Sequence, residues 1–226
     1  MVIAIDGPAG SGKSTVAKLL AERLGYLYVD TGAMYRALTY KALKEKIDLE
    51  DGKDLTSLAR EAKILLKEQS GKLKVFLNGE EVTESIREES VTNNSFYLAR
   101  VPSVRAEMVK QQRRMAQGNN LVMEGRDITT VVFPKAELKV YLDASLKERA
   151  KRRFLELKKK GVKTTLKKIA QELKIRDKKD KTRKVAPLRI AKESFLIDST
   201  KMKIEEEVDL ILKKWREKYG TAKNSN

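Results

Sequence analysis

The chain has 226 residues, a hydrophobic fraction of 41 % and a formal net charge of +17. This length fits one α/β domain with an inserted subdomain, or at most two small domains. The sequence has no cysteine and no histidine, which excludes disulfides, thiol chemistry, a histidine base and metal sites built from these residues. Since no apolar run approaches the roughly 18 residues of a membrane span, we expect no membrane partner.

A glycine-rich turn follows the first expected strand, residues 2–5, and leads into an expected helix. Residues 7–14 have the spacing Gly-x-x-x-x-Gly-Lys-Ser. Glycines let the backbone turn its N–H groups toward phosphate oxygens, and the positive end of the helix faces the same anion. The alternative is a turn that only leads a strand into a helix. The spacing favours a polyphosphate site made of Gly7, Pro8, Ala9, Gly10, Ser11, Gly12, Lys13, Ser14 and Thr15.

Two residues of this turn carry the expected chemistry of ATP and Mg²⁺. Lys13 would reach the β- and γ-phosphates of ATP. The Ser14 hydroxyl would hold Mg²⁺. ATP and Mg²⁺ are therefore the expected cofactors, and the need for ATP points to a cytoplasmic protein.

The next elements begin with a short strand over residues 26–29, which ends at Asp30-Thr31-Gly32 and leads into a helix over 33–46. The pattern then changes, and residues of about 48–95 are expected to form an inserted lobe. Its expected elements are a helix over about 54–69 and strands over 73–77 and 80–83, joined by an Asn78-Gly79 turn.

The second half of the chain returns to alternating strands and helices. Its expected elements are a helix from Pro102 to about 117, strands over 121–123 and 138–142, helices over about 145–160 and 165–179, a strand over 195–198, a closing helix over about 203–218 and a frayed end over 220–226. Strands separated by helices predict a parallel sheet covered on both faces, with its sites at the carboxyl ends of the strands.

Most of the excess positive charge lies in one segment. Residues 147–184 hold eighteen Lys and Arg but only five Asp and Glu, a net charge of +13. Such a stretch can be a solvated helix face, a nucleic-acid surface, or a mobile basic arm that closes over ATP and an acidic acceptor. Aromatic residues make up 6 % of the chain and do not cluster within this segment, so no nucleic-acid partner is expected.

Five blocks of sequence, in this order, resemble the bacterial cytidylate kinases, which are P-loop nucleoside-monophosphate kinases. The similarity spans about residues 2–215. The blocks are Ile5 to Thr15, Asp30-Thr31-Gly32-Ala33-Met34-Tyr35-Arg36, Glu124-Gly125-Arg126-Asp127 with Val131-Val132-Phe133-Pro134, Leu142-Asp143-Ala144-Ser145, and Arg176-Asp177-x-x-Asp180-x-x-Arg183 with Ala186-Pro187-Leu188.

The resemblance implies a single α/β domain, 1–226, with the three-layer P-loop NTPase fold and a parallel sheet. It also implies an inserted monophosphate-binding lobe at about 48–95, a basic lid at about 147–180, and ATP-dependent phosphorylation of CMP and dCMP. The family's CMP contacts match Thr31, Arg36, Arg105, Arg126, Asp127, Arg176, Asp180 and Arg183. Guanidinium forks suit a phosphate acceptor. Asp127 and Asp180 would accept from the cytosine amino group, orient an arginine or contact sugar hydroxyls.

The catalytic residues expected from the resemblance and from charge are Lys13, Arg126, Arg149 and Arg153. Arg149, Arg152 and Arg153 share a helix face and could close on the transferring phosphoryl group, although a solvated basic face is the alternative for Arg152. The phosphate of CMP, with a second pKa near ~6, needs no general base.

Glu124 is the expected carboxylate for Mg²⁺, through water, whereas Asp6 could instead orient the loop. Thr129 stands where the family usually has glycine, so the local turn could differ. The alternative functions are a P-loop kinase for another small acceptor, such as AMP or shikimate, and a nucleic-acid-binding P-loop protein. A monomer is expected because no apolar face is left unassigned.

Overall fold

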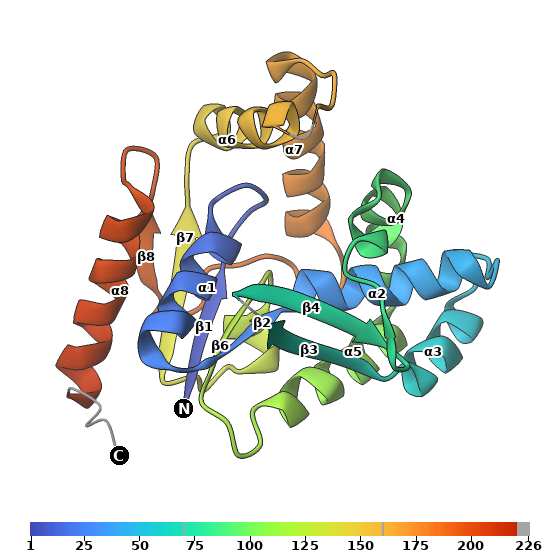
Figure 1. Ribbon diagram of the computed structural model, residues 1–226, viewed down its shortest axis with the longest axis horizontal. Coiled ribbons are helices and arrows are strands. Elements are labelled where there is room, and N and C mark those ends of the chain that lie inside the picture. Colours follow the sequence, from blue (N-terminus) through green and yellow to red (C-terminus); the bar gives the residue numbers. More distant parts are fainter. Residues whose placement is uncertain (70, 160, 221–226) are drawn as a thin grey trace. The chain divides into compact units, whose positions relative to one another are not determined.

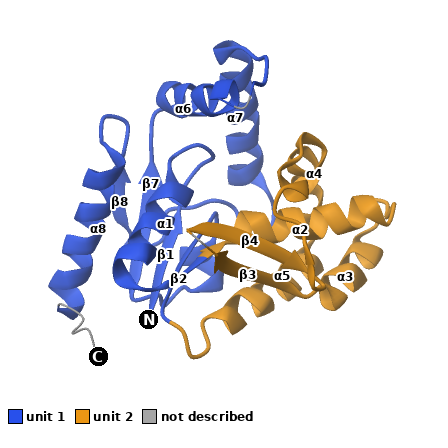
Figure 2. Cartoon of the chain, in the orientation of Figure 1, with its two compact units in different colours: residues 1–28, 120–226 blue, residues 29–119 orange. Residues whose placement is uncertain are grey.

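The computed structural model describes residues 1–69, 71–159 and 161–220, and the chain forms two compact units (Figure 2). Unit 1 comprises residues 1–28 and 120–226, and unit 2 comprises residues 29–119. The chain therefore leaves unit 1 after its first helix and returns to it for the second half of the sequence. Among the described residues, no helix combines the length and the apolar character needed to cross a membrane.

A five-stranded sheet with the strand order β2-β6-β1-β7-β8 organises unit 1 (Figure 1). Its strands are β1 (Val2–Asp6), β2 (Leu27–Asp30), β6 (Leu121–Gly125), β7 (Leu138–Asp143) and β8 (Phe195–Asp198). β1 pairs in parallel with both β6 and β7, and β7 pairs in parallel with β8. The carboxyl ends of β1, β6, β7 and β8 consequently meet at one edge of the sheet, as the sequence predicts.

The position of β1 between β6 and β7 explains its sequence. Ile3, Ala4 and Ile5 are fully buried, as expected for a strand covered on both faces. At its carboxyl end, Asp6 is level with Gly125 on one side and with Tyr141 on the other. The turn that follows β1 therefore begins beside the ends of both neighbouring strands.

Unit 1 contains the helices α1 (Lys13–Leu24), α6 (Leu146–Lys159), α7 (Leu166–Thr182) and α8 (Ile204–Tyr219), and a π-helical turn, η2 (Ile128–Val132). α1 packs against β6 and α8, and Trp215 of α8 is buried edge-on against Tyr26. α6 and α7 pack on each other around Ala150, Ile169 and Leu173. Ala9 of the glycine-rich turn belongs to this same apolar cluster, so the two helices are packed directly on the turn.

Unit 2 contains α2 (Thr31–Lys44), α3 (Gly52–Glu61), β3 (Ile64–Gln69), β4 (Lys72–Leu77), β5 (Glu80–Glu81), η1 (Ser85–Arg87), α4 (Glu89–Ala99) and α5 (Pro102–Met115). β3, β4 and β5 form an antiparallel sheet, and Asn78-Gly79 makes the turn between β4 and β5, as predicted. Asp30 caps α2 by accepting a hydrogen bond from the Ala33 N–H.

The helix predicted over about 54–69 is wrong in its second half. α3 ends at Glu61, and residues 64–69 form β3, which pairs with β4. Ile64 and Leu66 are buried while Leu65 is exposed, which is the alternation of a strand. The helical periodicity of the leucines continues by coincidence across a break at Ala62, whose extended backbone ends the helix.

The remaining strands and α-helices lie within a few residues of their predicted positions, except that α4, η1 and η2 were not predicted. The end expected to fray includes residues 221–226, which lie outside the described residues. The boundaries of unit 2, after residues 28 and 119, are wider than the lobe expected at about 48–95.

Candidate active site

The glycine-rich turn has the backbone geometry that its sequence predicts. Gly10 and Gly12 have φ angles of 77° and 98°, in a region that other residues rarely adopt. Gly7 is required for a different reason, because a Cβ at this position would lie 2.0 Å from the carbonyl oxygen of Leu142. The turn therefore passes too close to the end of β7 to carry a side chain there.

Lys13 lies at the start of α1, and its ammonium group is held within the turn. Its Nζ donates to the carbonyl oxygen of Pro8 at 2.8 Å, and only 4 % of the residue is exposed. Burial, followed by the charge of Arg126, lowers the pKa of Lys13 to about 7, although Glu124 and Asp6 partly oppose this. A phosphate placed next to Lys13 would favour its charged form.

The two residues predicted to bind Mg²⁺ contact each other. The Ser14 hydroxyl donates to Oε1 of Glu124 at 2.6 Å, and Glu124 is buried at the end of β6. The described residues contain no cluster of three or more acidic side chains that could enclose a metal ion by themselves. A hydroxyl and one carboxylate fit Mg²⁺, which is commonly held by one or two carboxylates together with substrate phosphates and water.

Asp6 has a structural role between β1 and η2. Its fully buried carboxylate accepts hydrogen bonds from the N–H groups of Ile128 and Thr129 and from the Thr129 hydroxyl. Burial raises the pKa of Asp6, although the hydrogen bonds from Thr129 and Ile128 oppose the shift. The φ angle of Thr129 is not positive, so this turn does not need glycine.

Arginine–aspartate pairs connect the end of β6 with α7 and the residues that follow it. The Arg126 Nε donates to Asp180 at 2.8 Å, and the Arg183 Nη2 lies 3.5 Å from Asp127. Burial raises the pKa of Asp180, but Arg126, Arg176 and Arg183 outweigh burial and lower it. The structure thus brings together the substrate-binding residues predicted in unit 1. It supports the arginine-orienting alternative for Asp127 and Asp180 in this conformation.

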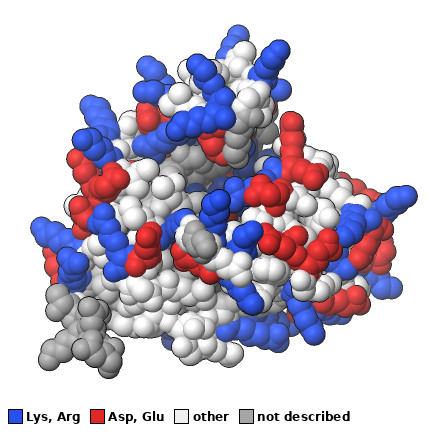
Figure 3. Space-filling model, viewed as in Figure 1, with Lys and Arg blue, Asp and Glu red and all other residues white. Residues whose placement is uncertain are grey.

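The arginines of α6 differ from one another in their surroundings. Arg149 is buried, forms a bidentate ion pair with Asp177 and donates to the carbonyl oxygens of Ala144 and Ala9. The side chain of Arg153 is 40 % exposed and pairs with Glu156 on its own helix. Lys and Arg side chains predominate over α6 and α7 in Figure 3. Arg149 therefore supports the turn directly, whereas Arg153 lies at the surface.

The substrate-binding residues predicted in unit 2 lie on α2 and α5. Thr31 is buried at the start of α2, and Arg36, one turn later, pairs with Asp30 at 3.2 Å. The guanidinium of Arg105, on α5, lies 5.7 Å from the ring centroid of Tyr35, on α2, and donates to the carbonyl oxygen of Ala99. Arg36 and Arg105 are thus held by contacts within unit 2.

Three residues around the turn were not predicted. Asp177 pairs with Arg149, Ser199 donates to the carbonyl oxygen of Ser11, and Glu207 is buried on α8 near Gly12. Ser199 follows the end of β8, and a polar residue just beyond a parallel strand is the signal that could have indicated it. Nothing in the helical pattern of residues 204–219 distinguishes Glu207 from the other acidic residues of α8.

The model of the cytidylate kinase family matches residues 3–217 of this chain. A cytidylate kinase of Geobacillus sp. (strain WCH70) is 51 % identical over 218 residues, which cover 96 % of this chain and 97 % of that protein. The cytidylate kinase of Lactiplantibacillus plantarum is 50 % identical over 93 % of this chain and 92 % of its own length. That of Caldicellulosiruptor bescii is 46 % identical over 98 % of this chain and 97 % of its own length. With a glycine-rich turn, Lys13 and a Ser14–Glu124 pair at the end of a parallel sheet, this chain belongs to the cytidylate kinase family.

Proposed function

We propose that this protein transfers the γ-phosphoryl group of ATP to the phosphate of CMP and dCMP, giving ADP with CDP or dCDP. The observation that carries the proposal is the Ser14–Glu124 pair, next to Lys13 on a turn of this geometry, in a chain that belongs to the cytidylate kinase family. The turn supplies N–H groups for the phosphates of ATP, and Lys13 supplies a positive charge.

Ser14 and Glu124 are the residues that we assign to Mg²⁺. When bound, the ion would neutralise charge on the phosphate oxygens of ATP. The Ser14 hydroxyl donates a hydrogen bond to Glu124, so the two side chains lie next to each other. Both would therefore face the same Mg²⁺ ion. The turn, Lys13 and this pair bind and orient the phosphoryl donor.

The acceptor needs binding and charge neutralisation but no base. The phosphate of CMP has a second pKa near ~6 and is already an anionic nucleophile at neutral pH. The absence of histidine from the chain is compatible with this chemistry. We assign CMP binding to the residues that match the family's contacts, namely Thr31, Arg36, Arg105, Arg126, Asp127, Arg176, Asp180 and Arg183.

We further assign phosphoryl-group stabilisation to Arg126, Arg149 and Arg153, and the monophosphate-binding lobe to residues of about 48–95. The lid is assigned to residues of about 147–180. The present contacts of Arg149 with Ala9 and Asp177 would have to change for its guanidinium to reach a phosphate. Within the described residues, the ion pair of Arg153 is local and half-exposed, so this side chain can be redirected at little cost.

The acceptor is tested by coupling ADP release to a spectroscopic readout with CMP, dCMP, UMP, AMP and shikimate as separate acceptors. We expect turnover with CMP and dCMP at the highest kcat/KM, and a loss of turnover when Mg²⁺ is removed by chelation. Faster turnover of AMP or shikimate than of CMP would contradict the proposal. Salt-dependent titration with RNA and DNA tests the alternative of nucleic-acid binding.

A further inference from the structure

The carbonyl oxygen of Ser11, in the middle of the glycine-rich turn, accepts two hydrogen bonds from outside the turn. One comes from Nη1 of Arg152, on α6, at 3.2 Å. The other comes from the hydroxyl of Ser199, in the loop between β8 and α8, also at 3.2 Å. Ser199 is completely buried, so its hydroxyl has no competing contact with bulk water.

The two donors also hold each other. Nη1 of Arg152 donates to the Ser199 hydroxyl at 3.0 Å, and Nη2 donates to the Ser199 carbonyl oxygen at 2.6 Å. We call this set of contacts among Ser11, Arg152 and Ser199 the Ser11 clamp. A lysine ammonium could not reproduce these contacts, because the three acceptors, one in the turn and two on Ser199, are shared between two nitrogens of one planar guanidinium.

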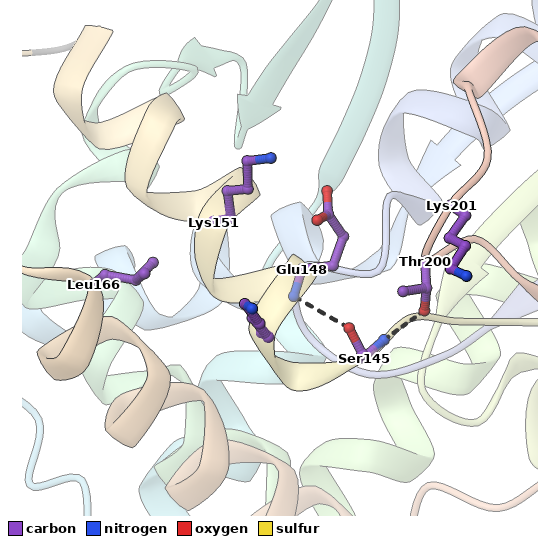
Figure 4. Close-up of a pocket in the computed structure, with 7 residues that line it drawn as sticks. Ser145, Glu148, Lys151, Leu166, Thr200 and Lys201 are labelled. Carbon is purple, nitrogen blue, oxygen red and sulfur yellow. Dashed lines mark hydrogen bonds between the residues drawn. The ribbon is translucent and has the colours of Figure 1, made fainter.

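The surroundings fix the position of the Ser11 clamp. The Ser199 N–H donates to the carbonyl oxygen of Asp143, at the end of β7. The next residue, Thr200, accepts a hydrogen bond from the N–H of Ser145, just before α6 (Figure 4). This second contact borders a hollow of about 330 Å³ between the start of α6 and the Thr200–Lys201 segment. The loop after β8 and the start of α6 are therefore joined to each other as well as to the turn.

The clamp determines the direction of one N–H group. In a planar trans peptide, the C=O and the following N–H point in opposite directions. The described chain has no cis peptide bond, so the Gly12 N–H points away from Arg152 and Ser199. The same relationship applies two residues earlier, where Arg149 donates to the carbonyl oxygen of Ala9 and the Gly10 N–H points the opposite way.

We propose that Arg152 and Ser199 are positioning residues for ATP, which act by holding the Ser11 carbonyl so that the Gly12 N–H faces the phosphates. The inference rests on the proposed function, because it takes the turn to be the phosphate site of a kinase. Arg152 accordingly acts through the backbone of the turn and does not contact the transferred phosphoryl group. Gly12 lies next to the clamp, since a Cβ there would be in ordinary van der Waals contact with Nη1 of Arg152, at 3.5 Å, and with Oε2 of Glu207, at 3.8 Å.

The test measures the affinity for a non-hydrolysable ATP analogue in the full-length protein, separately from turnover. We expect Arg152→Gln to weaken binding of the analogue at least tenfold, which corresponds to about 1.4 kcal/mol. The affinity for CMP should stay within twofold of the parent. Ser199→Ala should weaken binding of the analogue severalfold, and the double variant should lose less than the product of the two single effects, because both donors share one acceptor.

Arg152→Lys and Lys158→Gln are the matched variants. Arg152→Lys keeps the charge but not the fork, so its affinity for the analogue should remain well below that of the parent. Lys158→Gln removes one exposed charge from the same helix and should leave the affinity unchanged. Parent-like affinity in Arg152→Lys would overturn the proposal by showing that charge alone matters. Unchanged affinity with a large fall in kcat in Arg152→Gln would overturn it in favour of direct contact with the transferring group.

Thermal melting of each variant restricts these measurements to folded protein, and Ser199→Ala tests the clamp if Arg152→Gln fails to fold. Parent-like affinity in Ser199→Ala, with additive effects in any folded double variant, would also overturn the proposal. The outcome for the clamp is separate from that for the proposed function. If the parent protein binds the ATP analogue but does not phosphorylate CMP, the acceptor assignment fails, while the affinity measurements still decide whether the clamp orients the turn.

Discussion

The hydroxyl of Thr129 donates a 2.6 Å hydrogen bond to the carboxylate of Asp6, at the carboxyl end of the central strand. Both side chains are buried, and the backbone N–H of Thr129 donates to the same carboxylate oxygen. A glycine at this position would supply only the backbone N–H, so the Thr129 side chain adds a second donor. The turn that follows Arg126 and Asp127 is thereby fixed to the strand that leads into the phosphate site.

Thr129→Val should destabilise the protein, because it removes this donor while nearly preserving the volume of the side chain. The buried carboxylate of Asp6 would lose one of its partners, at an expected cost of about 1 to 3 kcal/mol in the free energy of unfolding. Thr129→Ser retains the hydroxyl and is the matched control. Chemical denaturation at pH 7 measures the difference, and equal stability of the Val and Ser variants would show that the bond contributes nothing.

The parallel sheet and its phosphate turn could be predicted because their signals are local. Apolar runs such as Val2 to Ile5 are typical of a strand covered on both faces, and the Gly-Lys-Ser spacing predicts the turn that follows. The break between α3 and β3 could not be found in the same way. Leu65 and Leu66 fit a helical period, and only pairing with β4 decides that they belong to a strand.

The contacts that hold the phosphate turn could not be predicted because their partners are distant in the sequence. Ser199 is separated from Ser11 by 188 positions, and a serine after a strand has many ordinary roles. Arg149 and Arg152 share a helix face, as their spacing predicts. Their contacts with the carbonyl oxygens of Ala9 and Ser11 depend on how α6 packs against the turn. This packing cannot be predicted from the spacing of residues within one helix.

Glu207→Gln should change how stability depends on pH. Burial raises the pKa of Glu207 to about 7 from an ordinary value of 4.5, although the positive charge of Arg152 partly opposes the shift. The folded state therefore binds a proton more tightly than the unfolded state. The tighter binding of this proton stabilises the folded state. The stabilisation is fully present below about pH 4.5 and is lost as the pH rises to about 7.

We accordingly expect Glu207→Gln to gain stability relative to the parent as the pH rises from 5 to 8, by on the order of 1 to 3 kcal/mol. The Oε2 atom of Glu207 has no hydrogen-bond partner in the described structure, so replacing the carboxylate by the glutamine amide breaks no hydrogen bond at that atom. Thermal melting across this pH range measures the difference. Glu205→Gln, on the exposed side of α8, is the control, and a parallel pH dependence in parent and Glu207→Gln would contradict the assignment.

Lys13→Met should abolish turnover while leaving the protein folded. Methionine keeps much of the length of the side chain but not the charge that Lys13 would place between the β- and γ-phosphates. The buried Nζ also donates to Pro8, so a modest loss of thermal stability is expected. Steady-state rates and melting curves are measured together, and a folded variant with a kcat near that of the parent would refute the assignment of the ATP site.

Arg153→Lys should lower kcat/KM for CMP by more than tenfold, because we assign its planar fork to the transferring phosphoryl group. The Arg153 side chain is 40 % exposed and pairs only locally in the described structure, with Glu156, so the substitution should hardly affect folding. Lys158→Gln and Lys159→Gln remove charge from the same helix without removing a guanidinium group, and both should keep parent kinetics.

If the lysine residues bound RNA instead, these two variants would lose affinity for RNA at physiological salt, and Arg153→Lys would keep its activity. That combination would replace the lid assignment by a nucleic-acid surface, whereas a selective loss in Arg153→Lys would identify the arginine as part of the catalytic machinery.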